Sequence, residues 1–170
     1  MKRTAKSSRR SLSKRKPKKS PALPASAKSA SAPVAQGETQ HPRIGLEYTV
    51  EAVVPHEWTI QAIDPRLPPV LSTPRMIQLM EHASTRAILG ELPPGTISVG
   101  TRIEVDHLKA VPDGATVHAH ARLSAYQGRF LIFDVEARSR DIVIGRGRVF
   151  RALVESGKHG AKARARVGAE

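Results

Sequence analysis

The order of hydrophobic patterns in the middle of the chain constrains the fold most. One long helical pattern is followed by four segments that read as strands, with only short turns between them. The helical segment begins at a Thr-Pro pair, with Thr73 expected as the N-cap and Pro74 as the first helical residue. It should end near Leu89, with Gly90 as the C-terminal cap. Its apolar stripe is formed by Met76, Met80, Ala83 and Ala87.

The remaining elements are indicated by alternation and by turn residues. Residues 46–54 alternate and predict a strand, and residues 55–72 contain four prolines and predict a loop. Strands are expected at 97–109, 117–123, 130–137 and 142–154. Turns are expected at 112–114, 126–129 and 139–141. The order of one helix and antiparallel strands predicts an α+β domain.

The positive charge of the chain is confined to its ends. The 170 residues carry a net charge of +13, but residues 44–155 hold 12 basic and 13 acidic residues. Residues 1–40 contain 11 Lys or Arg and one acid, with almost no large apolar side chains. We therefore expect disordered basic tails at 1–43 and 156–170 around one domain at 44–155. Weak, non-specific contact with nucleic acid or an anionic surface is a hypothesis about these tails.

Several classes of protein are excluded or disfavoured by composition. The chain has no cysteine, so disulfides and thiolate chemistry are excluded, and any metal would need His and carboxylate ligands only. We expect neither a metal nor a cofactor. It contains no run of 18 apolar residues, so no membrane span is predicted. The basic start lacks the apolar region of a secretory signal, so we expect a cytoplasmic protein. A transit peptide is the alternative, but the Lys-Pro density favours a solvated tail.

Two polar residues occupy unusual positions in this pattern. Glu81 lies at the border of the apolar stripe, and no basic residue stands three or four positions away to pair with it. His107 shares the phase of Val99, Thr101, Ile103 and Val105 in the expected strand. Each has a simpler interpretation, as a solvated carboxylate and as a core histidine with satisfied hydrogen bonds. Thr73 could likewise be only a helix cap, and Gly100 only a strand bulge.

The spacing of these residues carries a resemblance to a known family. Glu81 follows Thr73 by eight residues, and His107 follows Glu81 by twenty-six. The neighbouring sequence segments are "SVGT" at 98–101 and "DHLKAVPDG" at 106–114. Over residues 46–155 the chain resembles the fluoroacetyl-CoA thioesterase branch of the hotdog acyl-CoA thioesterases. The resemblance implies a hotdog fold, a homodimer, and Thr73, Glu81 and His107 as catalytic residues.

The chemistry of thioester hydrolysis gives these residues roles. His107 would transfer the proton, Glu81 would orient the imidazole, and the Thr73 hydroxyl would either attack the thioester or hold the attacking water. The Gly100 N–H would donate to the oxyanion, and Arg75 would either meet the anionic CoA or remain a surface residue. In a dimer the site forms between protomers, which leaves open a site whose imidazole is His107 of the partner subunit.

The expected activity is hydrolysis of a short- or medium-chain acyl-CoA to the free acid and CoA. The stretch from Thr59 to Ser72 contains no Phe or Tyr to wall a pocket for a very small acyl group, so we do not expect fluoroacetyl specificity. The alternative is a hotdog module that binds acyl-CoA without turnover.

Overall fold

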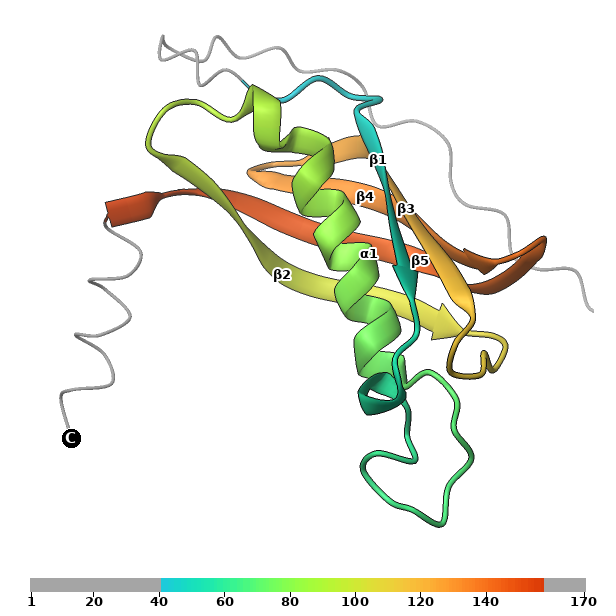
Figure 1. Cartoon of the computed structure of the whole chain (residues 1–170). Coiled ribbons are helices and arrows are strands. Elements are labelled where there is room, and N and C mark those ends of the chain that lie inside the picture. The colour runs from blue at the N-terminus through green and yellow to red at the C-terminus, as the bar shows by residue number, and fades with distance from the viewer. Residues whose placement is uncertain (1–40, 158–170) are drawn as a thin grey trace, which may run out of the picture. The chain divides into compact units, whose positions relative to one another are not determined.

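The computed structural model describes residues 41–157, which contain one long helix and one five-stranded sheet (Figure 1). The strands are β1 (Glu47–Val53), β2 (Thr96–His107), β3 (Thr116–Gln127), β4 (Phe130–Ser139) and β5 (Ile142–Glu155). The helix is α1 (Thr73–Ile88), and two 3₁₀ turns are η1 (His56–Trp58) and η2 (Leu89–Glu91).

The sheet has the strand order β1-β3-β4-β5-β2, with every neighbouring pair antiparallel. The two edge strands, β1 and β2, are the strands on either side of α1 in the sequence. The chain therefore passes from one edge of the sheet to the other through the helix. Tight turns join β3 to β4 and β4 to β5, and they use positive φ angles at Gly128 (59°) and Arg140 (51°). The predicted α+β class is confirmed, and so is the predicted order of elements along the chain, one strand, one long helix and then four strands.

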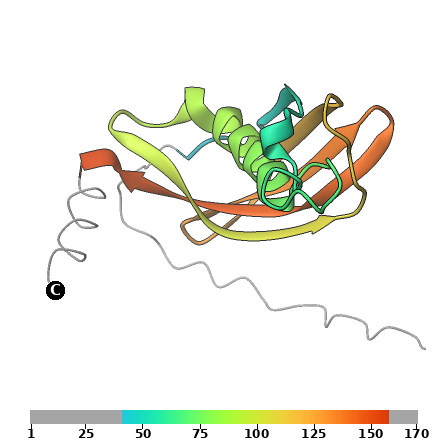
Figure 2. The same cartoon turned by 60° about the horizontal axis from the view of Figure 1, so that its bottom comes forward.

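Helix α1 lies across one face of the curved sheet (Figure 2). Strands β3 and β4 alternate between buried and more exposed residues, so one face of each contributes to the core. Two small residues at the centre, Ala119 and Ala137, are paired across the strands and fully buried. At Gly145 a β-carbon would lie 2.5 Å from the sulfur of Met76. These small residues let the helix approach the sheet closely.

Both expected helix caps are wrong. Ser72 occupies the N-cap, and Thr73 is the first residue of the helix. The Thr73 hydroxyl contacts a side chain of β2 instead of capping the helix. At the other end the helix passes directly into the 3₁₀ turn η2, so Gly90 is not a left-handed cap. Tightening of the last turn is a common way for a helix to end without a glycine cap.

A β-bulge in β2 changes which residues face the helix. The register with β5 shifts between Gly100 and Arg102, so Thr101 is the extra residue. Beyond the bulge, Val105 packs against the core, in phase with His107 as expected. Before the bulge, Gly100 faces the helix, because a β-carbon there would overlap Oε1 of Glu81. The expected continuous face from Val99 to His107 is therefore wrong.

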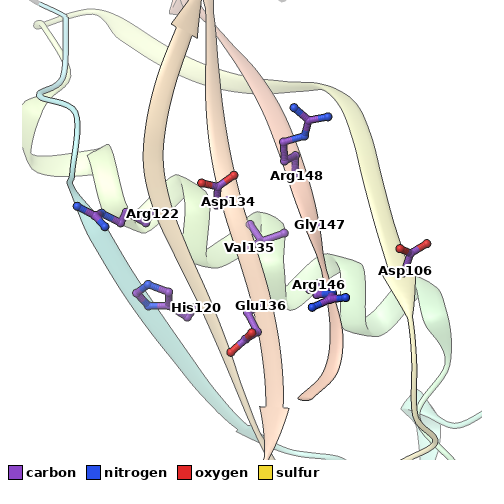
Figure 3. A pocket seen from close by; sticks show the side chains of 9 residues that line it. All are labelled: Asp106, His120, Arg122, Asp134, Val135, Glu136, Arg146, Gly147 and Arg148. Carbon is purple, nitrogen blue, oxygen red and sulfur yellow. The ribbon is translucent and has the colours of Figure 1, made fainter. Parts of the chain in front are cut away.

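The face of the sheet away from the helix is charged. Two rows of paired residues cross the five strands, and both alternate in charge over most of their length. The rows are Glu47, Arg122, Asp134, Arg148, Glu104 and Thr49, His120, Glu136, Arg146, Asp106. All of these residues except Glu47, Thr49 and Glu104 line a shallow hollow of about 600 Å³, and Figure 3 shows their side chains standing out from the strands. Cross-strand pairs of opposite charge stabilise a sheet, and so explain this face.

Candidate active site

The start of α1 and the end of β2 bring Thr73 and His107 together. The Thr73 Oγ1 lies 2.9 Å from Nδ1 of His107. The other ring nitrogen, Nε2, lies 3.1 Å from the backbone oxygen of Lys109. Because a carbonyl can only accept, Nε2 carries the proton in the neutral ring and Nδ1 is free to accept. The Thr73 hydroxyl therefore donates to an imidazole whose tautomer the backbone fixes.

This pair has the arrangement of a nucleophile and its base. A hydroxyl that donates to an unprotonated imidazole nitrogen can lose its proton to that nitrogen as it attacks a carbonyl. Both side chains line a cavity of about 280 Å³ with apolar neighbours that include Ile60 and Leu71. Within this chain the second ring nitrogen of His107 contacts the carbonyl of Lys109, and no contact with Glu81 is present among residues 41–157.

The carboxylate of Glu81 belongs to a second cluster, further along the helix. Its Oε1 lies 3.8 Å from the Arg151 guanidinium. Gly100 lies directly against the same oxygen, and a β-carbon at position 100 would displace the Glu81 carboxylate. The Glu81 side chain is 35% exposed, whereas that of Arg151 is only 6% exposed. Arg151 therefore contacts the Glu81 carboxylate from the buried side, and the other side of the carboxylate is accessible to a ligand.

Arg151 is the site residue that the sequence reasoning missed. Its Nε donates to the Ser98 hydroxyl at 2.5 Å, and its Nη2 donates to the Ser98 carbonyl at 3.0 Å. Its Nη1 donates to the Ser84 hydroxyl at 3.5 Å. Burial lowers the pKa of Arg151, and the charge of Glu81 acts in the opposite direction. The signal was present in the alternation of β5, where Arg151 has the phase of Val149, a core residue.

Arg75 lies near Glu81 and not beside the Thr73–His107 pair. The two residues line one cavity of about 440 Å³, together with Trp58 and Arg151. The Arg75 guanidinium lies 5.8 Å from the centre of the Trp58 ring and donates to the Gln78 side chain at 2.9 Å. The cavity is thus lined by one carboxylate and two guanidinium groups and is predominantly polar.

The five residues expected from the sequence therefore form two groups. Thr73 and His107 are in direct contact, and Glu81, Gly100 and Arg75 lie around Arg151. Eight helical residues separate Thr73 from Glu81, a rise of about 12 Å. Within residues 41–157, no hydrogen bond or ion pair joins Glu81 to His107.

The described part of the chain contains neither a metal-binding cluster nor a membrane-spanning helix. Among residues 41–157, no three His, Asp or Glu side chains are close enough together to hold a metal ion. In the same range, no helix combines the length and hydropathy needed to cross a bilayer.

Comparison with known proteins identifies relatives over most of the chain. A family model described as fluoroacetyl-CoA-specific thioesterase matches residues 54–157. The fluoroacetyl-CoA thioesterase of Streptantibioticus cattleyicolor is 38% identical over 128 residues, covering 72% of this chain and 92% of that protein. A solved structure of a fluoroacetyl-CoA thioesterase has 37% identity and a TM-score of 0.67, covering 72% of this chain and 96% of its own.

More distant structures share the architecture. A Thermus thermophilus protein described as a thioesterase superfamily member has 29% identity and a TM-score of 0.70, over 77% of this chain and 99% of its own. A hot-dog-like protein from Thermanaerovibrio acidaminovorans has 20% identity and a TM-score of 0.69, over 75% and 94%. Because the family model and the 38% identical relative each match well over half of it, the chain belongs to the fluoroacetyl-CoA-specific thioesterase family, and it is a thioester hydrolase with a hotdog fold.

Proposed function

We propose that this protein hydrolyses a short- or medium-chain acyl-CoA other than fluoroacetyl-CoA. The observation that carries the proposal is the hydrogen bond from the Thr73 hydroxyl to a His107 ring of fixed tautomer. In this arrangement the hydroxyl attacks the thioester carbonyl, or holds the water that does, and His107 receives the proton. The imidazolium then protonates the leaving thiolate of CoA, which restores the neutral ring. If the hydroxyl attacks, the acyl group is left as an ester on Thr73, and a water molecule activated by His107 then hydrolyses this ester to release the free acid and restore the hydroxyl.

The choice of acyl group rests on the loop between η1 and α1. The loop carries aliphatic side chains where a rigid pocket for a very small group would need aromatic ones. Ile63 is 79% exposed and Leu67 is 40% exposed, so both are available to contact an acyl chain. Flexible aliphatic side chains accept acyl groups of more than one length, because a methylene more or less changes the binding free energy only by roughly 1–3 kcal/mol.

We further propose that the active protein is a homodimer in which the two clusters meet. Strand β2 is an edge strand of 12 residues, and its outer edge has no partner among residues 41–157. It also exposes Ile97 (39%) and Ile103 (41%). A long, apolar edge of this kind tends to pair with another chain. Pairing would let Glu81 of the partner subunit face the Thr73–His107 pair and stabilise the imidazolium.

Release of free CoA, followed with a thiol reagent, tests the activity. Acetyl-CoA, longer acyl-CoA thioesters and fluoroacetyl-CoA are compared by kcat/KM. We expect turnover with the unfluorinated substrates, and a loss of at least ~10²-fold in kcat/KM for His107→Gln. Saturable binding without CoA release would instead support a binding module. A clear preference for fluoroacetyl-CoA would contradict the proposed substrate range.

Residues 1–40 and 158–170, which make up most of the predicted basic tails, lie outside the described residues, and their role stays a prediction. Non-specific contact with nucleic acid or an anionic surface would depend steeply on salt, and a cytoplasmic location would place such surfaces within reach. The proposed hydrolysis requires neither.

A further inference from the structure

A groove continues from the Thr73–His107 pair towards the turn between β4 and β5. The cavity that holds the pair shares Lys109 and Ala110 with a second cavity of about 500 Å³. The second cavity lies where the end of β2 meets the start of β5. The backbone N–H groups of Leu108 and Lys109, just after β2, donate to the carbonyl of Ile144 in β5 at 2.7 and 3.2 Å. A ligand held at the pair can therefore extend into this second cavity.

The walls of the second cavity are apolar and its charges are all positive. The apolar surface comes from Val111, Pro112, Ala115, Ile142 and Ile144. The charged side chains are Lys109 and Arg140, and neither has an acidic partner among residues 41–157. The acid in the adjoining loop, Asp113, is paired with His56 at 3.5 Å and does not line the cavity.

Two other hollows contrast with this groove. The hollow on the outer face of the sheet mixes acids and arginines, so an anion would meet repulsion there (Figure 3). The hollow beside Arg75 contains the Glu81 carboxylate. Among these hollows, only the groove at Lys109 and Arg140 combines unpaired positive charge with an apolar floor and continuity with the catalytic pair.

We propose that this groove binds the CoA portion of the substrate, with the pantetheine arm on the apolar floor and the phosphates at Lys109 and Arg140. This inference rests on the proposed function, because it assumes a CoA thioester at the Thr73–His107 pair. A CoA thioester has the matching order of groups, since the thioester is joined to the phosphates by a long, weakly polar arm. Unpaired cations on an exposed surface attract phosphates without first having to break an internal ion pair.

The test compares acetyl-CoA with acetyl-pantetheine, which has the same thioester and arm but lacks the nucleotide phosphates. The double variant Lys109→Gln with Arg140→Asn removes both charges. Asn tolerates the positive φ of residue 140 better than most residues, so the turn is retained. Arg129→Gln is the matched control, because Arg129 lies in the turn at the opposite end of β4.

We expect the double variant to raise KM for acetyl-CoA by roughly tenfold, with kcat little changed. The KM for acetyl-pantetheine should not move, and the control variant should match the parent with both substrates. Added salt should raise the parent's KM for acetyl-CoA more than that of the double variant. An unchanged KM for acetyl-CoA, or an equal rise for both substrates, would overturn the proposal.

Calorimetric titration with CoA and with pantetheine keeps this test independent of turnover. If the parent hydrolyses neither substrate, the proposed function fails, but the groove is still tested by binding. Loss of CoA affinity in the double variant, with pantetheine affinity unchanged, would support the groove. Equal CoA affinity in the parent and the double variant, or no CoA binding by the parent, would refute it.

Discussion

At the residue scale, the position of Thr73 separates a catalytic role from a structural one. A threonine at an N-cap uses its oxygen to accept a backbone N–H. Here Ser72 has the N-cap position, and the Thr73 hydroxyl faces the imidazole of His107. The hydroxyl is therefore not needed to complete the helix, and its removal should affect chemistry more than stability.

Replacement of Thr73 by Val tests this directly, because Val keeps the shape and removes the hydroxyl. We expect a melting temperature close to that of the parent and a kcat/KM lower by at least tenfold, which corresponds to ~1.4 kcal/mol in the barrier. Thr73→Ser, which keeps a hydroxyl, is the control and should retain most of the activity. A Val variant that turns over like the parent would remove Thr73 from the mechanism.

Arg151 is the residue whose replacement should affect both stability and activity. Its planar guanidinium contacts Ser98 through two nitrogens and Glu81 through a third. A lysine ammonium cannot make this fork of bonds. We expect Arg151→Lys to lower the free energy of unfolding by about 1–3 kcal/mol and to reduce kcat/KM as well. Urea unfolding and steady-state kinetics measure the two effects; an unchanged unfolding midpoint would argue that the fork is not a stabilising feature.

At the element scale, the bulge in β2 is what places Gly100 against the helix. The extra residue turns Gly100 towards Glu81, at a point where the strand and helix are too close for a side chain. The same bulge lets the rest of the strand present His107 to Thr73. One irregularity thus sets the positions of both clusters.

A β-carbon at position 100 should therefore disturb Glu81 specifically. Gly100→Ala would push the carboxylate away from Arg151, and we expect kcat/KM to fall by about tenfold or more. Gly95→Ala serves as a comparison for the loss of a glycine, since the space around Gly95 is open although its positive φ adds strain. If Gly100→Ala has full activity, the close approach has no role in catalysis.

The segment that precedes β1 is held to the domain by Tyr126. The Tyr126 hydroxyl donates to the Pro42 carbonyl at 2.5 Å, and Arg43 forms a salt bridge with Glu91. Burial raises the pKa of Tyr126, and the charge of Glu91 raises it further. The neutral phenol is thus the form that the fold favours.

This shift predicts a loss of stability at alkaline pH. A group with a raised pKa in the folded state contributes stability that is complete below its unfolded pKa, here near 10, and that is lost as the pH rises through the folded value. Tyr126→Phe should remove this part of the alkaline dependence and cost about 1 kcal/mol at neutral pH for the lost hydrogen bond. Unfolding free energies from pH 8 upward, for both proteins, provide the measurement; parallel curves would contradict it.

At the scale of the whole molecule, the separation of Thr73 and His107 from Glu81 suggests that one chain is not a complete enzyme. A helix is rigid, so the eight positions from Thr73 to Glu81 keep Glu81 about 12 Å along the axis from Thr73. A second copy, paired through the free edge of β2, could bring the two clusters together. Dimers with two-fold symmetry would then contain two equivalent sites.

Mixing two inactive variants tests whether the site is shared. Thr73→Val and Glu81→Gln are co-expressed, so that mixed dimers form. If each site uses Thr73 of one chain and Glu81 of the partner subunit, a mixed dimer has one intact site, and activity should return to about a quarter of the parent's. Each variant alone, at the same total concentration, is the control. No recovery in dimers shown to be mixed would mean that the site lies within one chain.

The sequence alone determined the class of fold and the order of its elements along the chain. Periods of 3.6 and two residues, and turn residues such as Gly114 and Gly128, are local properties, so the order of amino acids is enough to recognise them. The resemblance to a family identified Thr73, Glu81 and His107 as candidate residues. It did not predict their contacts, because residues 34 positions apart, such as Thr73 and His107, meet only when the chain folds.

Only the tertiary structure decided which of these residues lie together. The β2 bulge broke an alternation that the sequence presents as continuous, since the extra residue is defined by pairing with β5 and not by any local signal. The Lys109 carbonyl that fixes the His107 tautomer is a backbone group, which no residue pattern reveals. The alternation of β5 places Arg151 on the buried face of the strand. The groups that stabilise its buried charge, Ser98 and Glu81, are brought to it only by folding.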